Sequence, residues 1–162
     1  MICQFAGYRP TAVFARGQVA PEAETPDGFE PEPALDGMII EFSNGVTGLQ
    51  VGNDGEHGGF YCEVIGSEGR VRAGMYIASY AANQQGKPID LEQHGLPPNA
   101  SVFTVAYDQI ADYLNGGSLP HCTNDDAVAV FEIGFGAIES IATNQRVVLP
   151  NAHRKRRVFA NG

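Results

Sequence analysis

At 162 residues, of which 43% are hydrophobic, the chain can bury one sizeable core but is too short for two comfortable domains. Its formal net charge of −9 argues against non-specific binding to nucleic acid or anionic lipid, because both require a basic surface. The 20 glycines and 10 prolines imply many turns, which favours a sheet-rich architecture over a helical bundle. We therefore expect a single domain over residues 1–162 that has no nucleic-acid partner.

The sequence carries no signal for a membrane or for secretion. No stretch approaches the roughly 20 apolar residues of a membrane span, and the start, Met-Ile-Cys-Gln-Phe, lacks the basic and then apolar segments of a signal peptide. Cys3, Cys62 and Cys122 are odd in number and widely spaced, which suits a reducing compartment better than a disulfide framework. We expect a cytoplasmic protein without a membrane partner.

Extended segments dominate the first third of the chain. Residues 11–20 are rich in residues that favour strands and predict a first strand. Residues 21–33 combine four prolines with five acidic residues and predict an acidic, proline-rich loop. Residues 37–42 and 46–51 flank Ser43-Asn44-Gly45, and Asn-Gly tolerates the positive φ angles of a tight turn. These two segments therefore predict a β-hairpin.

Further strands are expected beyond the hairpin. Residues 60–65 form another extended run, which a glycine-flanked turn reverses into residues 70–72, and residues 75–80 predict an additional strand. Ile39 and Ile40 are adjacent, so they point to opposite faces of the pleat. Both faces of the sheet therefore need cover, from helices on one face and from another subunit on the other.

Two amphipathic helices follow. The first begins at Ser101 and ends at Asn115-Gly116-Gly117, which suit a left-handed cap. The second begins after Thr123, whose hydroxyl is placed to cap it in a capping-box pattern. Gly134 and Gly136 weaken this helix and indicate that its backbone lies close against the sheet. The expected apolar stripes are Phe103, Ala106, Tyr107, Ile110, Tyr113 and Leu114 on the first helix, and Ala127, Val130, Phe131, Gly134, Ala137, Ile138 and Ile141 on the second.

Three motifs occur in an order that a known enzyme family shares. Ala34-Leu-Asp-Gly-Met-Ile-Ile-Glu-Phe-Ser-Asn-Gly-Val-Thr-Gly48 resembles the strand-turn-strand of the Gfo/Idh/MocA oxidoreductases, the glucose–fructose oxidoreductase and inositol dehydrogenase family. Cys62-Glu-Val-Ile-Gly-Ser-Glu-Gly69 is similar to that family's E-I-x-G-x-x-G turn. Ile138-Glu-Ser-Ile-Ala, followed by Arg146-Val-Val-Leu-Pro150, is similar to its closing A-I-x-S-A…V-x-L-P signature. The resemblance covers residues 11–150 and corresponds to the C-terminal domain of the family.

This resemblance implies an α+β fold, with an open, mainly antiparallel β-sheet, helices packed on one face, and the other face available for oligomerisation. It implies the substrate-binding and oligomerisation domain of an NAD(P)-dependent sugar or polyol oxidoreductase. In full-length members an N-terminal Rossmann domain carries the nicotinamide. The partners that it implies are a second copy, in a homodimer formed through the sheet face, and a Rossmann domain that a partner chain could supply.

The chain departs from the family in the residues of hydride transfer. It contains no G-x-G-x-x-G, whereas a dinucleotide site needs such glycines between a strand and a helix N-terminus. The family's E-K-P lysine has no counterpart, since the lysines are Lys87 and Lys155, and residues 1–10 contain neither His nor Asp to serve as the general acid or base. We therefore expect no catalytic residue, no bound cofactor and no hydride transfer by this chain alone. The alternative hypothesis is a non-catalytic binding or assembly module that retains the fold.

The candidate substrate-facing residues, Asp54, Glu56 and His57, lie in a glycine-rich loop. Their side chains could hydrogen-bond a polyol, and the alternative interpretation is a polar surface turn. We expect no metal site here, because the sequence shows no second pair of ligands.

Two other polar segments have structural interpretations. His121 and Cys122 are adjacent in one loop, where a Cys–His nucleophile is seldom formed, so we expect packing or capping. Residues 151–162 form a basic tail, in which residues 153–157 hold four of the ten Lys and Arg residues. We interpret it as a polar strand or tail that offsets the acidic body, with a nucleic-acid or localisation patch as the alternative.

Overall fold

The computed structural model describes residues 6–7, 9–19, 24–52, 61–74, 79–90, 102–152 and 155–159. Within these residues the chain is α+β, as predicted, and every strand pair but one is antiparallel. It divides into two compact units. One is formed by Ile2–Asp54 with Asn124–Gly162, and the other by Gly55–Thr123. The assignment of residues 1–162 to a single domain stays a prediction.

The first unit contains a four-stranded antiparallel sheet in the order β4-β3-β1-β8. Its strands are β1 (Pro10–Gln18), β3 (Ala34–Phe42), β4 (Thr47–Val51) and β8 (Val147–Val148). The predicted first strand and hairpin are both confirmed. Gly45 takes the positive φ of 85° that the tight turn requires, and Val46 N donates a hydrogen bond to Asn44 Oδ1 at 3.2 Å.

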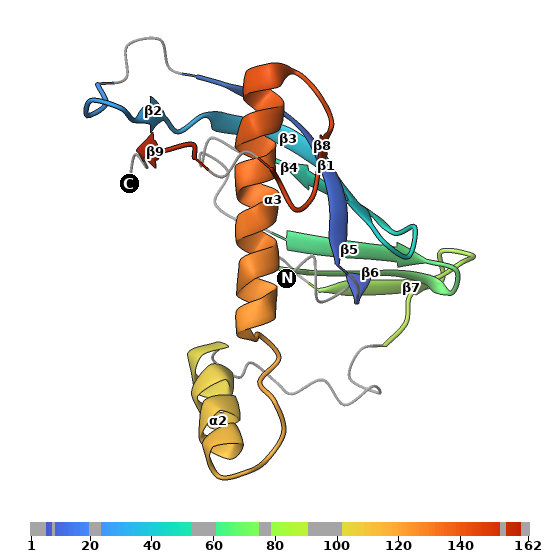
Figure 1. Ribbon diagram of the computed structural model, residues 1–162. Helices are drawn as coiled ribbons and strands as arrows, with labels where there is room; N and C mark the ends of the chain where they lie inside the picture. Colours follow the sequence, from blue (N-terminus) through green and yellow to red (C-terminus); the bar gives the residue numbers. More distant parts are fainter. Residues whose placement is uncertain are drawn as a thin grey trace. The chain divides into compact units, whose positions relative to one another are not determined.

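Helix α3 (Asn124–Thr143) lies along β1 (Figure 1) and begins directly after Thr123, as the capping pattern predicts. The fully buried hydroxyl of Ser140 joins the two elements. It accepts a hydrogen bond from Ala15 N at 2.9 Å and donates one to the Gln145 carbonyl at 2.6 Å. The core around this contact consists of Ala6, Val13, Ala15, Ile40, Phe42, Ile133, Ala137 and Leu149.

Gly136 lets the helix backbone approach the sheet. A Cβ atom at this position would lie 2.8 Å from side-chain atoms of both Val13 and Leu149, closer than packed carbon atoms allow. The prediction of a close approach is therefore confirmed at Gly136. It is wrong at Gly134, where a Cβ atom would have no neighbour within 4 Å.

The predicted apolar stripe of α3 was only partly right. Ala137 is buried, but Val130 and Phe131 are exposed, and the buried face carries Ile133, Gly136, Glu139 and Ser140 as well. The helix is apolar around much of its circumference, so residue spacing alone does not select a face. The small residues determine which face of α3 is buried, because they allow β1 to pack close to the helix backbone.

The two faces of this sheet differ in how far they are buried. Ile39 and Ile40 lie on opposite faces, as expected for adjacent residues of a strand. Ile40 is fully buried on the face that packs against α3, whereas Ile39 points to the opposite face and is exposed. Ile39 pairs with Leu49 on β4, and Leu49 and Val51 are 71% and 84% exposed. An apolar surface therefore lies on the side of the sheet away from the helix.

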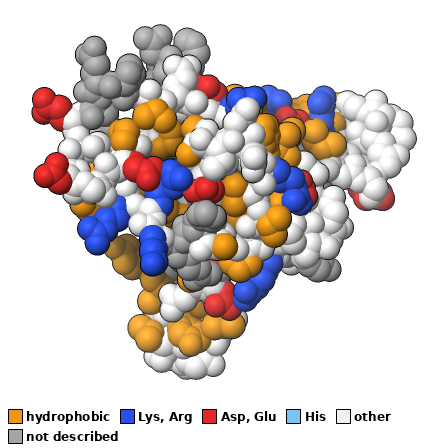
Figure 2. Space-filling model, turned by 45° about the horizontal axis from the view of Figure 1, so that its top comes forward, with side chains coloured by type: hydrophobic (Ala, Val, Ile, Leu, Met, Phe, Trp, Pro, Cys, Tyr) orange, Lys and Arg blue, Asp and Glu red, His pale blue; other side chains and the backbone are white. Residues whose placement is uncertain are grey.

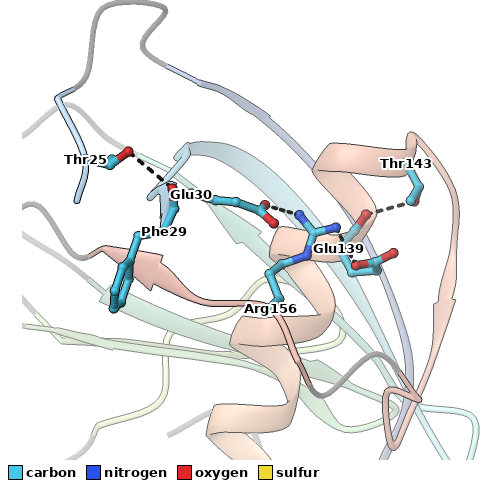
Figure 3. Close-up of polar contacts among 6 residues, drawn as sticks. All are labelled: Thr25, Phe29, Glu30, Glu139, Thr143 and Arg156. Atoms are coloured by element: carbon cyan, nitrogen blue, oxygen red, sulfur yellow. Dashed lines mark hydrogen bonds and ion pairs between the residues drawn. The ribbon is translucent and has the colours of Figure 1, made fainter. Parts of the chain in front are cut away.

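The basic C-terminal segment pairs with the acidic loop. Strand β2 (Glu30–Pro31) lies parallel to β9 (Val158–Phe159), so the predicted loop of residues 21–33 contains a short strand. Figure 3 shows Arg156 between the carboxylates of Glu30 and Glu139, and its guanidinium forms ion pairs with both. In residues 155–159, the tail therefore offsets acidic groups as predicted.

The second unit contains α2 (Val102–Leu114) and the antiparallel sheet β5-β6-β7. The strands are β5 (Tyr61–Gly66), β6 (Gly69–Gly74) and β7 (Tyr80–Asn83). The predicted strand over residues 75–80 begins only at Tyr80, and residues 75–78 lie outside the described residues.

Helix α2 matches its predicted bounds, and Gly116 has the positive φ expected after a helix end. Its apolar stripe, expected to pack, is exposed instead: Phe103, Tyr107, Ile110, Tyr113 and Leu114 all face solvent. Figure 2 shows hydrophobic side chains gathered at the bottom of the view, where this helix lies.

Candidate functional site

The residues predicted to face the substrate cannot be placed. Asp54, Glu56 and His57 fall within residues 53–60, outside the described residues. Their role in polyol binding stays a prediction.

The other candidate pair, His121 and Cys122, lies in the loop that follows α2. His121 and Cys122 are both exposed, and the His121 backbone N donates a hydrogen bond to Gln109 Oε1 on α2 at 3.1 Å. Asp112 supports the same loop, because its Oδ2 accepts hydrogen bonds from the backbone N and hydroxyl of Ser118. The loop after α2 is thus held by polar contacts back to the helix.

A cluster of charged and aromatic residues lies on one face of the β5-β6-β7 sheet. Glu63 on β5, Arg72 on β6 and Tyr80 on β7 pair directly across the three strands. Tyr61 and Arg70 lie two residues along their strands, and side chains two apart in a strand share a face. We call these five residues the arginine–tyrosine face.

The hairpin between β5 and β6 sets this arrangement. A two-residue turn, Ser67-Glu68, connects Gly66 to Gly69 and fixes the register that places Glu63 opposite Arg72. At Gly69 a Cβ atom would lie 2.1 Å from the Ala82 carbonyl oxygen. Only glycine therefore allows β7 to pair at this distance.

Charge pairing on this face is unequal. Arg72 Nη2 donates a hydrogen bond to Glu63 Oε2 at 2.8 Å, whereas Arg70 Nη1 lies 3.9 Å from Glu63 Oε1, beyond hydrogen-bonding distance. The hydrogen bond to Glu63, together with that carboxylate's negative charge, raises the pKa of Arg72 above its usual value. Arg72 therefore stays cationic at any physiological pH.

Aromatic rings hold both guanidinium groups. The Cζ atom of Arg72 lies 4.8 Å from the ring centroid of Tyr61, and that of Arg70 lies 5.5 Å from the centroid of Tyr80. These distances are within the range of cation–π contacts. A guanidinium group does not donate a proton at neutral pH, so the two arginines are suited to binding and not to acid–base catalysis.

Our sequence reasoning missed this face, although the sequence contains its signal. Tyr61 and Glu63, and then Arg70 and Arg72, alternate at the period of a strand on either side of a glycine-flanked turn. Such alternation places all four side chains on one face once the hairpin closes.

Two segments can be assessed as dinucleotide sites: the glycine turn at residues 66–69 and the N-terminus of α3. The glycine turn at residues 66–69 leads into strand β6, not into a helix, as its sequence indicates. Helix α3 carries Asp125 and Asp126 in its first turn, and these negative charges would repel a diphosphate. Neither the turn at residues 66–69 nor the start of α3 therefore offers a diphosphate-binding helix N-terminus.

Two other site classes can be assessed for the described part. It contains no group of three or more His, Cys, Asp and Glu side chains placed to hold a metal ion. In the same residues, neither helix combines the length and hydropathy needed to cross a bilayer.

Solved structures of oxidoreductases share this fold. The aldose–aldose oxidoreductase from Caulobacter crescentus, complexed with glycerol, superposes with a TM-score of 0.67 at 18% identity, over 91% of this chain and 44% of its own. An oxidoreductase from Agrobacterium radiobacter, in complex with NAD+, L-tartaric acid and magnesium, gives a TM-score of 0.62 at 17% identity, over 91% and 45%. The WlbA dehydrogenase from Bordetella pertussis, with NADH and UDP-GlcNAcA, gives 0.57 at 15% identity, over 88% and 41%.

These matches define the fold class of the chain. The resemblance to the Gfo/Idh/MocA oxidoreductases is confirmed at the level of the fold. The chain spans less than half the length of the three solved structures. No protein-family model and no curated protein matches its sequence.

Proposed function

We propose that this chain is the substrate-binding and oligomerisation domain of an NAD(P)-dependent sugar or polyol oxidoreductase. The observation that supports this most is the fold it shares with three oxidoreductases over 88–91% of its residues. Two of those structures contain NAD+ or NADH, and one contains glycerol. The nicotinamide would be bound by a Rossmann domain, in the same polypeptide or in a partner chain, so the chain is not catalytic on its own. We further propose that residues 1–162 act as one cytoplasmic domain.

The substrate contact assigned to Asp54, Glu56 and His57 can be tested by NMR. Adding glycerol, myo-inositol or glucose should shift the backbone amides of residues 53–60, because a polyol binds through hydrogen bonds to such groups. The Asp54→Asn/His57→Asn double variant should lose these shifts. A titration with NADH, followed by its fluorescence, should show no saturable binding. Tight NADH binding, or polyol shifts that the double variant retains, would refute the proposal.

The exposed face of the four-stranded sheet supports oligomerisation. Ile39, Leu49, Val51 and Val148 all point away from α3 and are exposed. Large exposed apolar patches are uncommon on monomers and mark interaction sites. We propose that a second copy covers it in a homodimer that buries about 1,200–2,000 Å² in total.

Light scattering tests the dimer. We expect a dimer at micromolar concentration for the wild-type chain and a monomer for Leu49→Glu, because a buried unpaired carboxylate opposes association. Val128→Glu is the matched control, since Val128 is an exposed valine on α3 and away from this face. A wild-type monomer, or equal dissociation by both variants, would count against the sheet face.

The alternative, a binding or assembly module without chemistry, can be separated from a split enzyme at the level of the gene. A glycine-rich Rossmann turn and an E-K-P segment in the reading frame adjoining codon 1, or in a neighbouring gene whose product binds this chain, would support the enzyme. A pull-down with this chain as bait that recovers no nucleotide-binding protein would support the module.

A further inference from the structure

The arginine–tyrosine face has an excess of positive charge on an acidic chain. Two guanidinium groups, of Arg70 and Arg72, share a single carboxylate, that of Glu63, while the whole chain has a net charge of −9. We propose that this face binds the oxyanion group, a carboxylate or a phosphate, of a small molecule. The proposal does not depend on the oxidoreductase assignment.

Glu63 leaves much of the donor capacity of the two arginines unused. It contacts Arg72 through one hydrogen bond, at Nη2, and is too far from Arg70 for a hydrogen bond. Arg72 Nε also has no hydrogen-bond partner among the described residues, but this atom is buried and faces away from solvent. A guanidinium group can donate two parallel hydrogen bonds to one carboxylate or phosphate. Arg70 is therefore the group best placed to receive such an anion.

The guanidinium groups are held in position before a ligand arrives. Tyr61 lies under Arg72 and Tyr80 under Arg70, at cation–π distance. Fixing long side chains in advance reduces the entropy that binding would otherwise cost. Two arginines free to move in solvent would lack this advantage.

The face is open to a ligand. The side chains of Arg70 and Arg72 are 49% and 41% exposed, whereas that of Glu63 is 19% exposed. An approaching anion therefore meets the two positive groups more readily than the negative one. Electrostatic attraction of this kind raises the association rate and weakens with salt.

Titration of the full chain followed by the arginine Nε–H signals in NMR tests the proposal. The probes are D-glucuronate, D-glucose 6-phosphate and neutral D-glucose, which share a sugar ring and differ in the charged group. We expect saturable shifts of the Arg70 and Arg72 signals with one or both charged sugars. Glucose should leave these two signals unmoved, whatever it does at residues 53–60. Binding of glucuronate alone assigns the face to carboxylates, and binding of the 6-phosphate alone assigns it to phosphates.

Matched substitutions distinguish binding at a specific site from general electrostatic attraction of an anion to any exposed arginine. Arg70→Gln should weaken binding at least about tenfold, as expected for loss of a charge-assisted hydrogen bond. Arg146→Gln is the control, because Arg146 is an equally exposed arginine whose guanidinium is already committed to both oxygens of Glu41. It should leave the affinity unchanged. Equal weakening by both variants, or no saturable binding by the wild-type chain up to high millimolar concentration, would overturn the proposal.

A third variant is expected to change the affinity in the opposite direction, toward tighter binding. Glu63→Gln removes the carboxylate that competes for the arginines, so it should tighten binding of the charged sugars. Damage to the fold could not produce such a gain. If Glu63→Gln weakens binding while the circular dichroism spectrum is unchanged, Glu63 is part of the ligand contact and the charge argument is wrong.

Discussion

Replacing Arg156 with methionine removes a guanidinium group that lies 2.8 Å from the Glu139 carboxylate. The Glu139 side chain is only 9% exposed, and its Oε2 has no hydrogen-bond partner of normal geometry in the described residues. The contact is therefore an ion pair by distance, and the variant leaves the buried Glu139 carboxylate without this counter-charge. Breaking a buried pair from one side costs about 3–5 kcal/mol.

The expected loss for this variant is smaller than that range, about 2–3 kcal/mol. Arg156 is 20% exposed, so water screens the pair in part, and methionine retains the packing of the long side chain. Arg156 also pairs with Glu30, but that carboxylate is about half exposed and can be hydrated when its partner is gone. Urea denaturation, followed by circular dichroism, measures the difference in unfolding free energy at neutral pH.

The double variant Arg156→Met/Glu139→Gln provides the control. With both charges removed, most of the lost stability should return, because burying a neutral amide costs less free energy than burying an unpaired carboxylate. A single variant that loses less than about 0.5 kcal/mol, within the range of ordinary surface changes, would refute the reasoning. So would a double variant that is less stable than the single one.

Three further predictions concern the sheet and helix α3. Ser140→Ala should cost about 1–3 kcal/mol in urea denaturation, because it leaves a buried backbone N–H unpaired; a loss below about 0.5 kcal/mol would contradict this. Gly136→Val should cost about 1–3 kcal/mol through overpacking, whereas Gly134→Val, which has open space at its Cβ, should not. Arg146 hydrogen-bonds both oxygens of Glu41 and holds the pKa of that carboxyl below its usual value of 4.5. This bond therefore stabilises the fold above the unfolded pKa and is lost as pH falls through the folded one. The stability advantage of wild type over Glu41→Gln should thus shrink as the pH falls below about 4.5, and an advantage that stays constant with pH would refute it.

Features that rest on neighbours in sequence could be predicted. The Asn44-Gly45 turn defined the hairpin of β3 and β4, and Thr123 and Gly116 marked the helix ends within one or two residues. These signals act over a few residues through φ preferences and capping hydrogen bonds. The fold class was predicted from the three family motifs at residues 34–48, 62–69 and 138–150, which lie in the strands, turns and helix that these local signals mark.

Features that rest on contacts between distant segments could not be predicted. The strand at Glu30 depends on its pairing with the C-terminal segment. In the arginine–tyrosine face, only the position of Tyr80 is of this kind, because it depends on the pairing of β7 with β6. The predicted site at Asp54, Glu56 and His57 stays a prediction, since residues 53–60 are not described.

The sequence by itself determined the alternation of strands, the positions of the turns and helix ends, and the two faces on which Ile39 and Ile40 lie. The tertiary structure decided which side of α3 is buried, because Gly136 and Ser140 admit β1 more closely than Val130 or Phe131 could. It also decided that Arg156 neutralises Glu139, 17 residues away along the chain. The physical reason is the distance along the chain over which each interaction acts. Backbone preferences act between neighbouring residues, whereas close packing and charge pairing join residues that are brought together only when the chain folds.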